Sequence, residues 1–185
     1  IPSYQRGYRW TEQATKLLDD LFEFYYSKPT QDDIYCLQPI IVRHNASKDT
    51  ETTFCYDIID GQQRLTTILL LLEQLPQEDD FCFLLSYERG NENRIDAHYK
   101  SSAKNAMSEW FSNIRKNKPD ISIKMEIVRI LLNNTNIIWY ELPEDTSSED
   151  CRKVFRNINA GKIPLTVSEL TKAMLLNAKL YKKEK

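Results

Sequence analysis

The residues best suited to chemistry form one run: Asp60, Gly61, Gln62, Gln63 and Arg64. Residues 54–59 before it are rich in β-branched and aromatic types, and leucine and isoleucine recur at helical spacing after it. These patterns predict a strand that turns directly into a helix. A helix N-terminus has unpaired N–H groups and a partial positive charge, so it attracts anions, of which phosphate is the obvious one.

Each residue of this run has a predicted role in such a turn. Asp60 is a good N-cap, and Gln63 three places later forms a variant of the capping box. Gly61 lies in the first turn, where the lack of a Cβ lets a ligand approach the backbone. Arg64 opposes the helix dipole, which an anion beside it, or the carboxylate of Asp60 or Asp57, would explain. A capped turn in an ordinary α/β domain is the alternative interpretation.

A second run, at the start of the chain, mixes aromatic rings, an amide and arginines: Tyr4, Gln5, Arg6, Tyr8, Arg9 and Trp10. If this run is extended, alternation places Tyr4, Arg6, Tyr8 and Trp10 on one side. Aromatic rings interleaved with arginines suit a base and a phosphate. The favoured alternative is an arm that lies over the core while its arginines reach water.

Composition excludes several classes of protein. A net charge of −2 and a pI of 5.8 over 185 residues give no general basic surface, so any contact with DNA must be local or made through a partner. The four cysteines have no metal-ligand spacing, which argues against zinc and favours a reduced, cytoplasmic protein. Cys36 and Cys55 could still face each other on neighbouring strands. No apolar run is long enough to span a membrane.

Periodicity and turn signals place the elements around these runs. We predict helices over residues 11–26, 95–116, 122–132, 146–159 and 166–183, the last two opened by capping boxes, and strands over residues 37–43, 53–59, 81–86 and 137–142. The fold class is therefore α+β. Residues 1–87 are expected to form a small mixed sheet with a central helix, and residues 88–185 a mainly helical lobe that packs on this core and completes the pocket.

Three stretches in this order resemble one family: Ile1-Pro2-x-Tyr4-Gln5-Arg6-x-Tyr8-x-Trp10, then residues 59–67 around the Asp60–Arg64 run, then Phe155-x-x-Ile158-Asn159-x-Gly161. The family is the N-terminal domain of GmrSD-type modification-dependent restriction proteins, which has a ParB/sulfiredoxin-like core. The resemblance covers nearly the whole chain. One departure is Gln38, which stands before Pro39 where family members often carry glycine.

The resemblance implies a prokaryotic defence protein against phage or modified DNA, whose N-terminal domain binds and hydrolyses a nucleoside triphosphate. In a mechanism on this basis we expect Asp60, Arg64 and Arg6 to be catalytic, with Arg64 holding the phosphates and Arg6 neutralising the charge that develops in transfer. The residues implied to bind the nucleotide are Gly61, Gln62, Gln63, Arg64, Tyr4, Gln5, Arg6 and Asn159. Phosphoryl chemistry usually requires a divalent ion, so Mg²⁺ is a further expected cofactor, held by Asp60 or by Asp57.

Two other functions stay open at this stage. The first is a non-catalytic DNA-recognition domain that presents Tyr4, Tyr8 and Trp10 to a modified or flipped base. The second, ranked last, is DNA nicking by this domain itself. The family's separate C-terminal nuclease does not follow Lys185, so we do not expect this chain to cleave DNA. The chain opens abruptly on Ile1-Pro2 and stops inside a lysine-rich helical stretch, so we expect a fragment of a longer protein that contacts DNA locally or through a C-terminal nuclease domain. A homo-oligomer is a further expectation.

Overall fold

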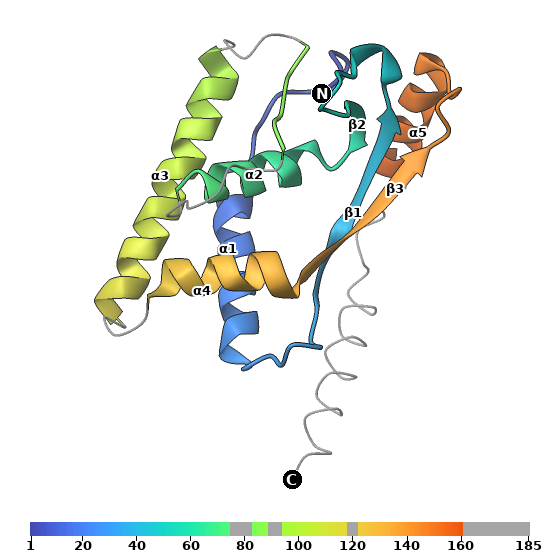
Figure 1. The fold of residues 1–185 in the computed structure, drawn as a ribbon. Helices are drawn as coiled ribbons and strands as arrows, with labels where there is room; N and C mark the ends of the chain where they lie inside the picture. Colours follow the sequence, from blue (N-terminus) through green and yellow to red (C-terminus); the bar gives the residue numbers. More distant parts are fainter. Residues whose placement is uncertain (75–82, 89–93, 118–121, 161–185) are drawn as a thin grey trace. The chain divides into compact units, whose positions relative to one another are not determined.

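The computed structural model describes residues 1–74, 83–88, 94–117 and 122–160 (Figure 1). Its first compact unit is Ile1–Ser148 and its second is Glu149–Lys185. Within the second unit the described residues are helical and belong to α5 (Ser148–Ala160). Everything that follows on the sheet, the core and the site concerns the first unit.

A three-stranded mixed sheet is the frame of the first unit. The strands are β1 (Tyr35–His44), β2 (Tyr56–Asp60) and β3 (Thr135–Leu142), in the order β2-β1-β3 (Figure 1). β1 and β2 form an antiparallel hairpin, whereas β1 and β3 are parallel. The pairing of β1 with β3 is irregular between Leu37 and Ile40, where Pro39 has no N–H to donate.

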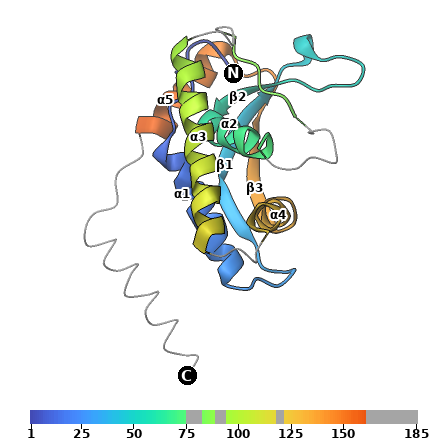
Figure 2. The ribbon, with the colours of Figure 1, turned by 90° about the vertical axis from the view of Figure 1, so that its left-hand side faces the viewer.

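The described residues of the first unit form four α-helices: α1 (Glu12–Tyr26), α2 (Gln62–Leu72), α3 (Arg94–Asn117) and α4 (Ile123–Arg129). α2 starts directly after β2, and α3 lies against both α1 and α2 (Figures 1 and 2). A π-helical turn, Ile130–Asn134, continues α4 and leads into β3. α2 is therefore enclosed by the hairpin at its beginning and by α3 along its length.

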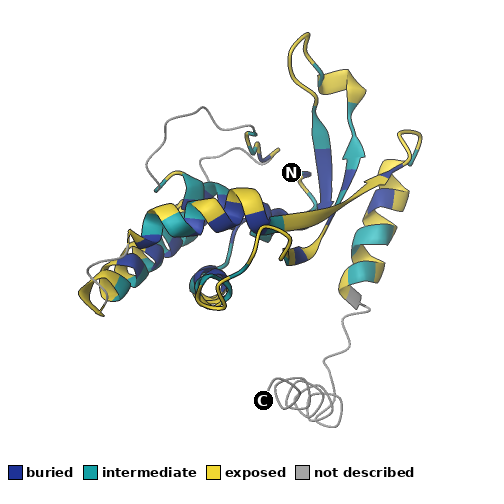
Figure 3. Ribbon diagram, turned by 60° about the horizontal axis from the view of Figure 1, so that its bottom comes forward, coloured by how far each residue is buried: buried dark blue, intermediate teal, exposed yellow. Residues whose placement is uncertain are grey.

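Two groups of buried apolar side chains hold these elements together. The larger joins α1, α2, α3 and α4, and includes Leu18, Leu21, Leu71, Met107 and Ile127. The smaller joins the hairpin to α2 through Ile40, Val42, Ile58 and Leu65. Buried positions therefore follow the inner faces of the helices, whereas β3 is exposed along most of its length (Figure 3).

The predicted α+β class is confirmed, and most predicted elements lie within a few residues of the observed ones. The strand predicted at residues 81–86 is wrong for its described part, because residues 83–87 join no sheet. This segment pairs instead with the start of the chain: Ile1 N donates to Ser86 O at 2.6 Å, and Glu88 N donates to Ile1 O at 3.0 Å. The helix predicted at residues 166–183 lies outside the described residues.

The structure also bears on the predicted domain boundary, on membrane spans and on the cysteines. The first compact unit contains residues on both sides of the predicted boundary at residue 87, and the division into two domains there stays a prediction. None of the helices in the described part of the chain has the length and apolar character to cross a bilayer. Cys36, Cys55 and Cys151 are free thiols.

Candidate functional site

The turn from β2 into α2 is made by Gly61, not by an Asp60 cap. Gly61 is the N-cap residue with φ of 99°, and no side chain caps the helix. The predicted capping box of Asp60 and Gln63 is therefore wrong. A left-handed residue reverses the chain without a cap, and an added Cβ at Gly61 would lie 2.9 Å from Ile40 Cγ1.

The side chains of Gln62 and Gln63 hold the arm formed by residues 1–10. Gln62 Nε2 donates to the carbonyl of Arg6 at 2.6 Å. Gln63 Nε2 donates to the carbonyl of Gly7 at 3.0 Å, and Gln63 Oε1 accepts from Arg9 N at 2.9 Å. Two amide side chains at the start of α2 thus replace the sheet partner that this part of the arm lacks.

Gln5 of the arm in turn forms hydrogen bonds to the end of β2. Its Nε2 donates to the carbonyls of Ile58 and Ile59 at the end of β2, and only 2% of the residue is exposed. The sequence runs 4–10 and 60–64, more than fifty positions apart, are therefore one hydrogen-bonded assembly. The structure brings together the predicted nucleotide-binding residues Gln5, Gln62 and Gln63.

The predicted alternation of the arm is wrong, because Tyr8 and Arg6 do not share an environment. Tyr8 is fully buried, whereas Arg6 is exposed. Thr67 Oγ1 donates to Gln63 O, so Tyr8 OH is the donor in its 2.9 Å hydrogen bond to Thr67. Burial raises the pKa of Tyr8 to about 12. Tyr8 is thus a core residue, as in the favoured interpretation of an arm that lies over the core.

Arg64 projects from the first turn of α2 towards β1. Its guanidinium donates to Gln38 Oε1 at 2.8 Å and to the carbonyl of Pro39, and it lies 3.4 Å from Asp60 Oδ2. The Arg64 and Asp60 side chains are only 12% and 16% exposed. Gln38, the residue that departs from the family pattern, therefore supplies one of the acceptors that hold this arginine.

Gln5 Oε1, Gln62 Oε1 and Arg64 Nε are buried polar atoms of this assembly that have no hydrogen-bond partner in the described part of the chain. Buried polar groups are normally satisfied, and each unsatisfied one costs about 1–3 kcal/mol. The N-terminus of α2, which no side chain caps, lies among them. A buried arginine N–H without an acceptor, beside helix amides, is an arrangement that an anionic oxygen would complete.

The other predicted nucleotide-binding residues lie in different places. Arg6 is exposed, and its backbone lies beside the turn, since its carbonyl accepts from Gln62. Tyr4 is half-buried in the same arm. Asn159 is on α5, within the second unit, and its Nδ2 donates to the carbonyl of Phe155 at 2.8 Å. Its predicted role stays a prediction.

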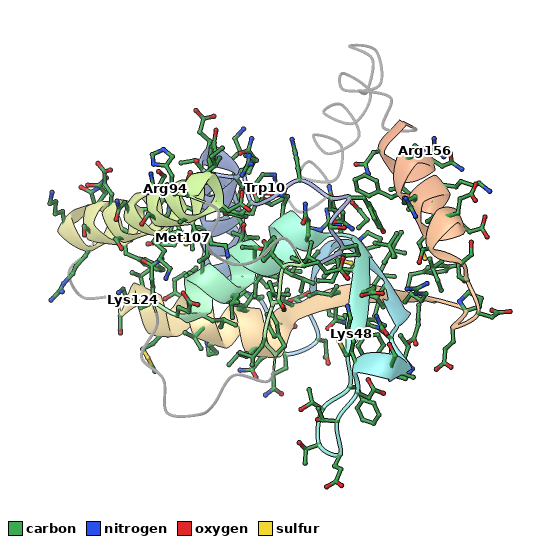
Figure 4. All side chains as sticks on the ribbon, turned by 90° about the horizontal axis from the view of Figure 1, so that it is seen from above. Trp10, Lys48, Arg94, Met107, Lys124 and Arg156 are labelled. Carbon is green, nitrogen blue, oxygen red and sulfur yellow. The ribbon has the colours of Figure 1, made fainter. Side chains whose placement is uncertain are left out.

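Asp57, the second carboxylate considered for this site, has its own partners. It accepts from Arg43 Nη2 at 2.8 Å and from Asn45 Nδ2 at 2.9 Å, and Lys48, which projects from the β1–β2 loop (Figure 4), is 3.7 Å away. Burial alone would raise the pKa of Asp57, but these hydrogen bonds and charges lower it.

Among the described residues, no group of three His, Cys, Asp or Glu side chains could hold a metal ion.

Sequence reasoning missed Asp96, which fixes the middle of the arm. Its carboxylate forms an ion pair with Arg9 Nη1 and is 5% exposed. It also lies against Gly7, where an added Cβ would overlap it. Gly7 was the sequence signal that could have pointed to this contact, because a glycine between bulky neighbours often marks a place where another side chain approaches the backbone closely. α2 and α3 therefore both hold the arm.

Comparison with known proteins agrees with the resemblance in the sequence. The model of the family described as "GmrSD restriction endonuclease, N-terminal domain" matches residues 1–176. The match covers nearly the whole chain, so the chain belongs to this family and is a domain of a restriction and defence protein. No curated protein matches the chain.

Proposed function

We propose, with membership of the GmrSD N-terminal domain family as the premise, that this domain binds and hydrolyses a nucleoside triphosphate at the start of α2. In this proposal it is the regulatory part of a restriction protein, and a separate nuclease domain cuts DNA. The phosphates would lie at the uncapped N-terminus of α2, between Arg64 and Arg6.

The observation that carries the proposal is the unpaired Nε of Arg64. This atom is buried, and the Gln38, Pro39 and Asp60 contacts of Arg64 involve only Nη1 and Nη2. An arginine held through its Nη atoms presents Nε in a fixed direction, so little conformational entropy is lost when an acceptor arrives. A phosphate oxygen is a strong acceptor for such a group.

The other residues have complementary roles in the proposal. Arg6 is exposed at the rim, where its guanidinium can move onto a phosphate and neutralise the charge that develops during transfer. Gln62 and Gln63 hold the arm in place and thereby position Arg6. Their own side-chain amides are used by the arm carbonyls, so they act on the nucleotide through their backbone N–H groups.

Asp60 would be the protein ligand of Mg²⁺ at this site. Mg²⁺ is usually bound by one or two carboxylates together with substrate phosphates and water, so one carboxylate fits this arrangement. When bound, the ion would neutralise phosphate charge. Asp60 Oδ2 lies 3.4 Å from Arg64 Nη2, longer than a normal hydrogen bond, and the side chain is therefore only loosely engaged.

The alternative function, base recognition by Tyr4, Tyr8 and Trp10, is less well supported. Tyr8 is fully buried, and its hydroxyl donates to Thr67. Trp10 is partly buried against the larger core group. A base could stack on Tyr8 only if the arm left its place. In the proposed function, DNA is therefore contacted chiefly through the nuclease domain.

The proposal is tested by calorimetric titration of the chain with each of the four NTPs in the presence of Mg²⁺. We expect one NTP at least to bind, and Arg6→Ala to weaken that binding about tenfold without altering thermal unfolding. Arg115→Ala on the last turn of α3 is the matched control, since Arg115 is also exposed. Absence of binding by all four NTPs would overturn the proposal.

A further inference from the structure

A cavity of about 260 Å³ lies away from the start of α2, between α2, α3 and the segment of residues 83–88. Its lining is Thr66, Leu69, Leu70, Glu73, Leu85, Tyr87, Ala97, Lys100, Ser101 and Lys104. None of the residues proposed to contact the nucleotide is among them. An engineered apolar cavity of about 150 Å³ is large enough for benzene, so this one can hold a single ring with a small polar group.

The charges in the lining favour an anion. Lys100 and Lys104 are its cations and Glu73 its only carboxylate, which leaves one net positive charge. Glu73 is paired with Lys104 at 2.6 Å. Lys100 Nζ lies over the ring of Tyr87, 4.5 Å from its centroid, and this contact holds the ammonium group at the cavity wall.

The rest of the lining is mixed, with leucines, Ala97 and the hydroxyl-bearing residues Thr66, Tyr87 and Ser101. Leucines from α2 and Leu85 supply the apolar surface. Thr66 Oγ1 donates to the carbonyl of Gln62, so the Tyr87 hydroxyl is the donor in its 2.6 Å hydrogen bond to Thr66. Burial raises the pKa of Tyr87, and the phenol stays neutral. A ligand here would therefore meet leucine side chains and the ammonium group of Lys100, for which the lining offers no carboxylate except Glu73, already paired with Lys104.

We propose that this cavity is a second binding site, which takes a small organic monoanion with one apolar ring, such as an aryl carboxylate. Apolar cavities with a few convergent polar groups are the usual form of small-molecule sites. A nucleoside triphosphate is too large and too highly charged for this volume and this single net charge. The site is therefore distinct from the one proposed at the start of α2, and neither depends on the other.

The position of the cavity connects it to the arm. Its walls are α2, whose Gln62 and Gln63 hold the arm carbonyls, and α3, whose Asp96 holds Arg9 immediately before the lining residue Ala97. At the far end, Gln74 Nε2 donates to Met107 Sδ at 3.3 Å and ties the end of α2 to α3 near Met107 (Figure 4). The two helices that line the cavity are therefore the same two that hold the arm.

The test is a titration of the whole chain, followed by ¹H–¹⁵N shifts, with benzoate, benzyl alcohol and acetate as probes. Benzoate carries both the ring and the charge, benzyl alcohol only the ring, and acetate only the charge. We expect benzoate to shift the amides of Tyr87, Ala97 and Lys100 and to bind more tightly than either other probe. Equal binding of acetate or of benzyl alcohol would overturn the proposed chemistry, and absence of benzoate shifts would overturn the site.

Two variants and one control distinguish benzoate binding in the cavity from non-specific binding to surface charge. Lys100→Gln should weaken benzoate binding about fivefold, as expected for a partly exposed charge. Ala97→Leu should abolish it by placing a larger side chain in the lining, which keeps the test decisive if Lys100→Gln does not fold. Lys16→Gln, at an exposed lysine on α1, should leave binding unchanged. Unchanged binding in Ala97→Leu would overturn the proposal, whatever the outcome for NTPs.

Discussion

The side chain of Gln63 accepts a hydrogen bond from the backbone N–H of Arg9 at 2.9 Å. The same amide donates to the carbonyl of Gly7 at 3.0 Å, so one side chain pairs with the arm as a neighbouring strand would. Gln63 is 9% exposed, its hydrogen bond to Gly7 is buried, and the one from Arg9 is partly buried. The repeated glutamines of the run are therefore a structural device that attaches the arm to the start of α2.

Gln63→Glu should destabilise the domain by about 1–3 kcal/mol at neutral pH. The substitution replaces the donor that faces Gly7 O with a carboxylate oxygen, so two acceptors would face each other in a buried place. Urea unfolding measures the effect. Gln13→Glu, an isosteric change at an exposed position of α1, should stay within about 0.5 kcal/mol of wild type. Equal stabilities for the two variants would contradict the proposed attachment.

Gly61→Ala should destabilise the domain by at least about 1–2 kcal/mol. The residue has φ of 99°, and the new methyl group would also press on Ile40 Cγ1 at 2.9 Å and Arg64 Nη2 at 3.3 Å. Gly61→Asn separates these two causes, since asparagine tolerates the left-handed region but keeps the Cβ. Thermal unfolding should rank the free energy of unfolding as wild type, then Asn, then Ala. An alanine variant as stable as wild type would show that the turn differs from the one described.

The stability of the hairpin should depend on pH through His44. Its Nδ1 lies 2.6 Å from Glu144 Oε1 and its Nε2 lies 2.8 Å from Asp49 Oδ2. Hydrogen bonds to Glu144 and Asp49 raise the pKa of His44. A raised pKa in the folded state contributes stability that is fully present below the unfolded value, about 6.5, and is lost as pH rises through the folded value.

The free energy of unfolding, measured by urea titration from about pH 5 to about pH 8, should therefore contain a decrease that His44→Gln removes. His98→Gln is the matched control, because His98 is the other histidine of the chain and lies exposed on α3. A profile of the same shape for His44→Gln and wild type would contradict the ion-pair contribution.

Arg64→Ala should abolish NTP hydrolysis and cost about 1–3 kcal/mol of stability through the loss of its bonds to Gln38 and Pro39. A domain with ordinary stability of about 5–15 kcal/mol would remain folded. Release of inorganic phosphate measures the activity, and circular dichroism checks the fold. Gln38→Ala is the control, since it removes one structural partner of Arg64 but leaves the guanidinium in place. Hydrolysis by a folded Arg64→Ala protein at the wild-type rate would refute the assignment.

The parts of this fold that are encoded locally could be predicted from the sequence. The apolar period of residues 95–116 predicted α3, and the β-rich run at residues 53–59 followed by leucines predicted the hairpin strand and α2. These signals depend only on neighbours in the chain. Proximity of the two motifs near one site also followed from the family resemblance.

The predictions that proved wrong concern features that depend on contacts between residues distant in sequence. Residues 83–87 have a strand-like composition, but their partner is Ile1, so no sheet forms. Asp60 has the chemistry of an N-cap, but the approach of Ile40 selects a left-handed glycine at the next position. Burial of Tyr8 depends on Thr67 in α2. No local pattern carries these three facts.

The central claim is that phosphate groups bind at the start of α2, and the backbone amides there can report it directly. On addition of NTP and Mg²⁺ to ¹⁵N-labelled protein, the amides of Gly61, Gln62, Gln63 and Arg64 should show the largest shifts, and Arg6→Ala should reduce them. If the largest shifts lay elsewhere, for example at Lys100 and Lys104, the phosphate site would not be at this helix end.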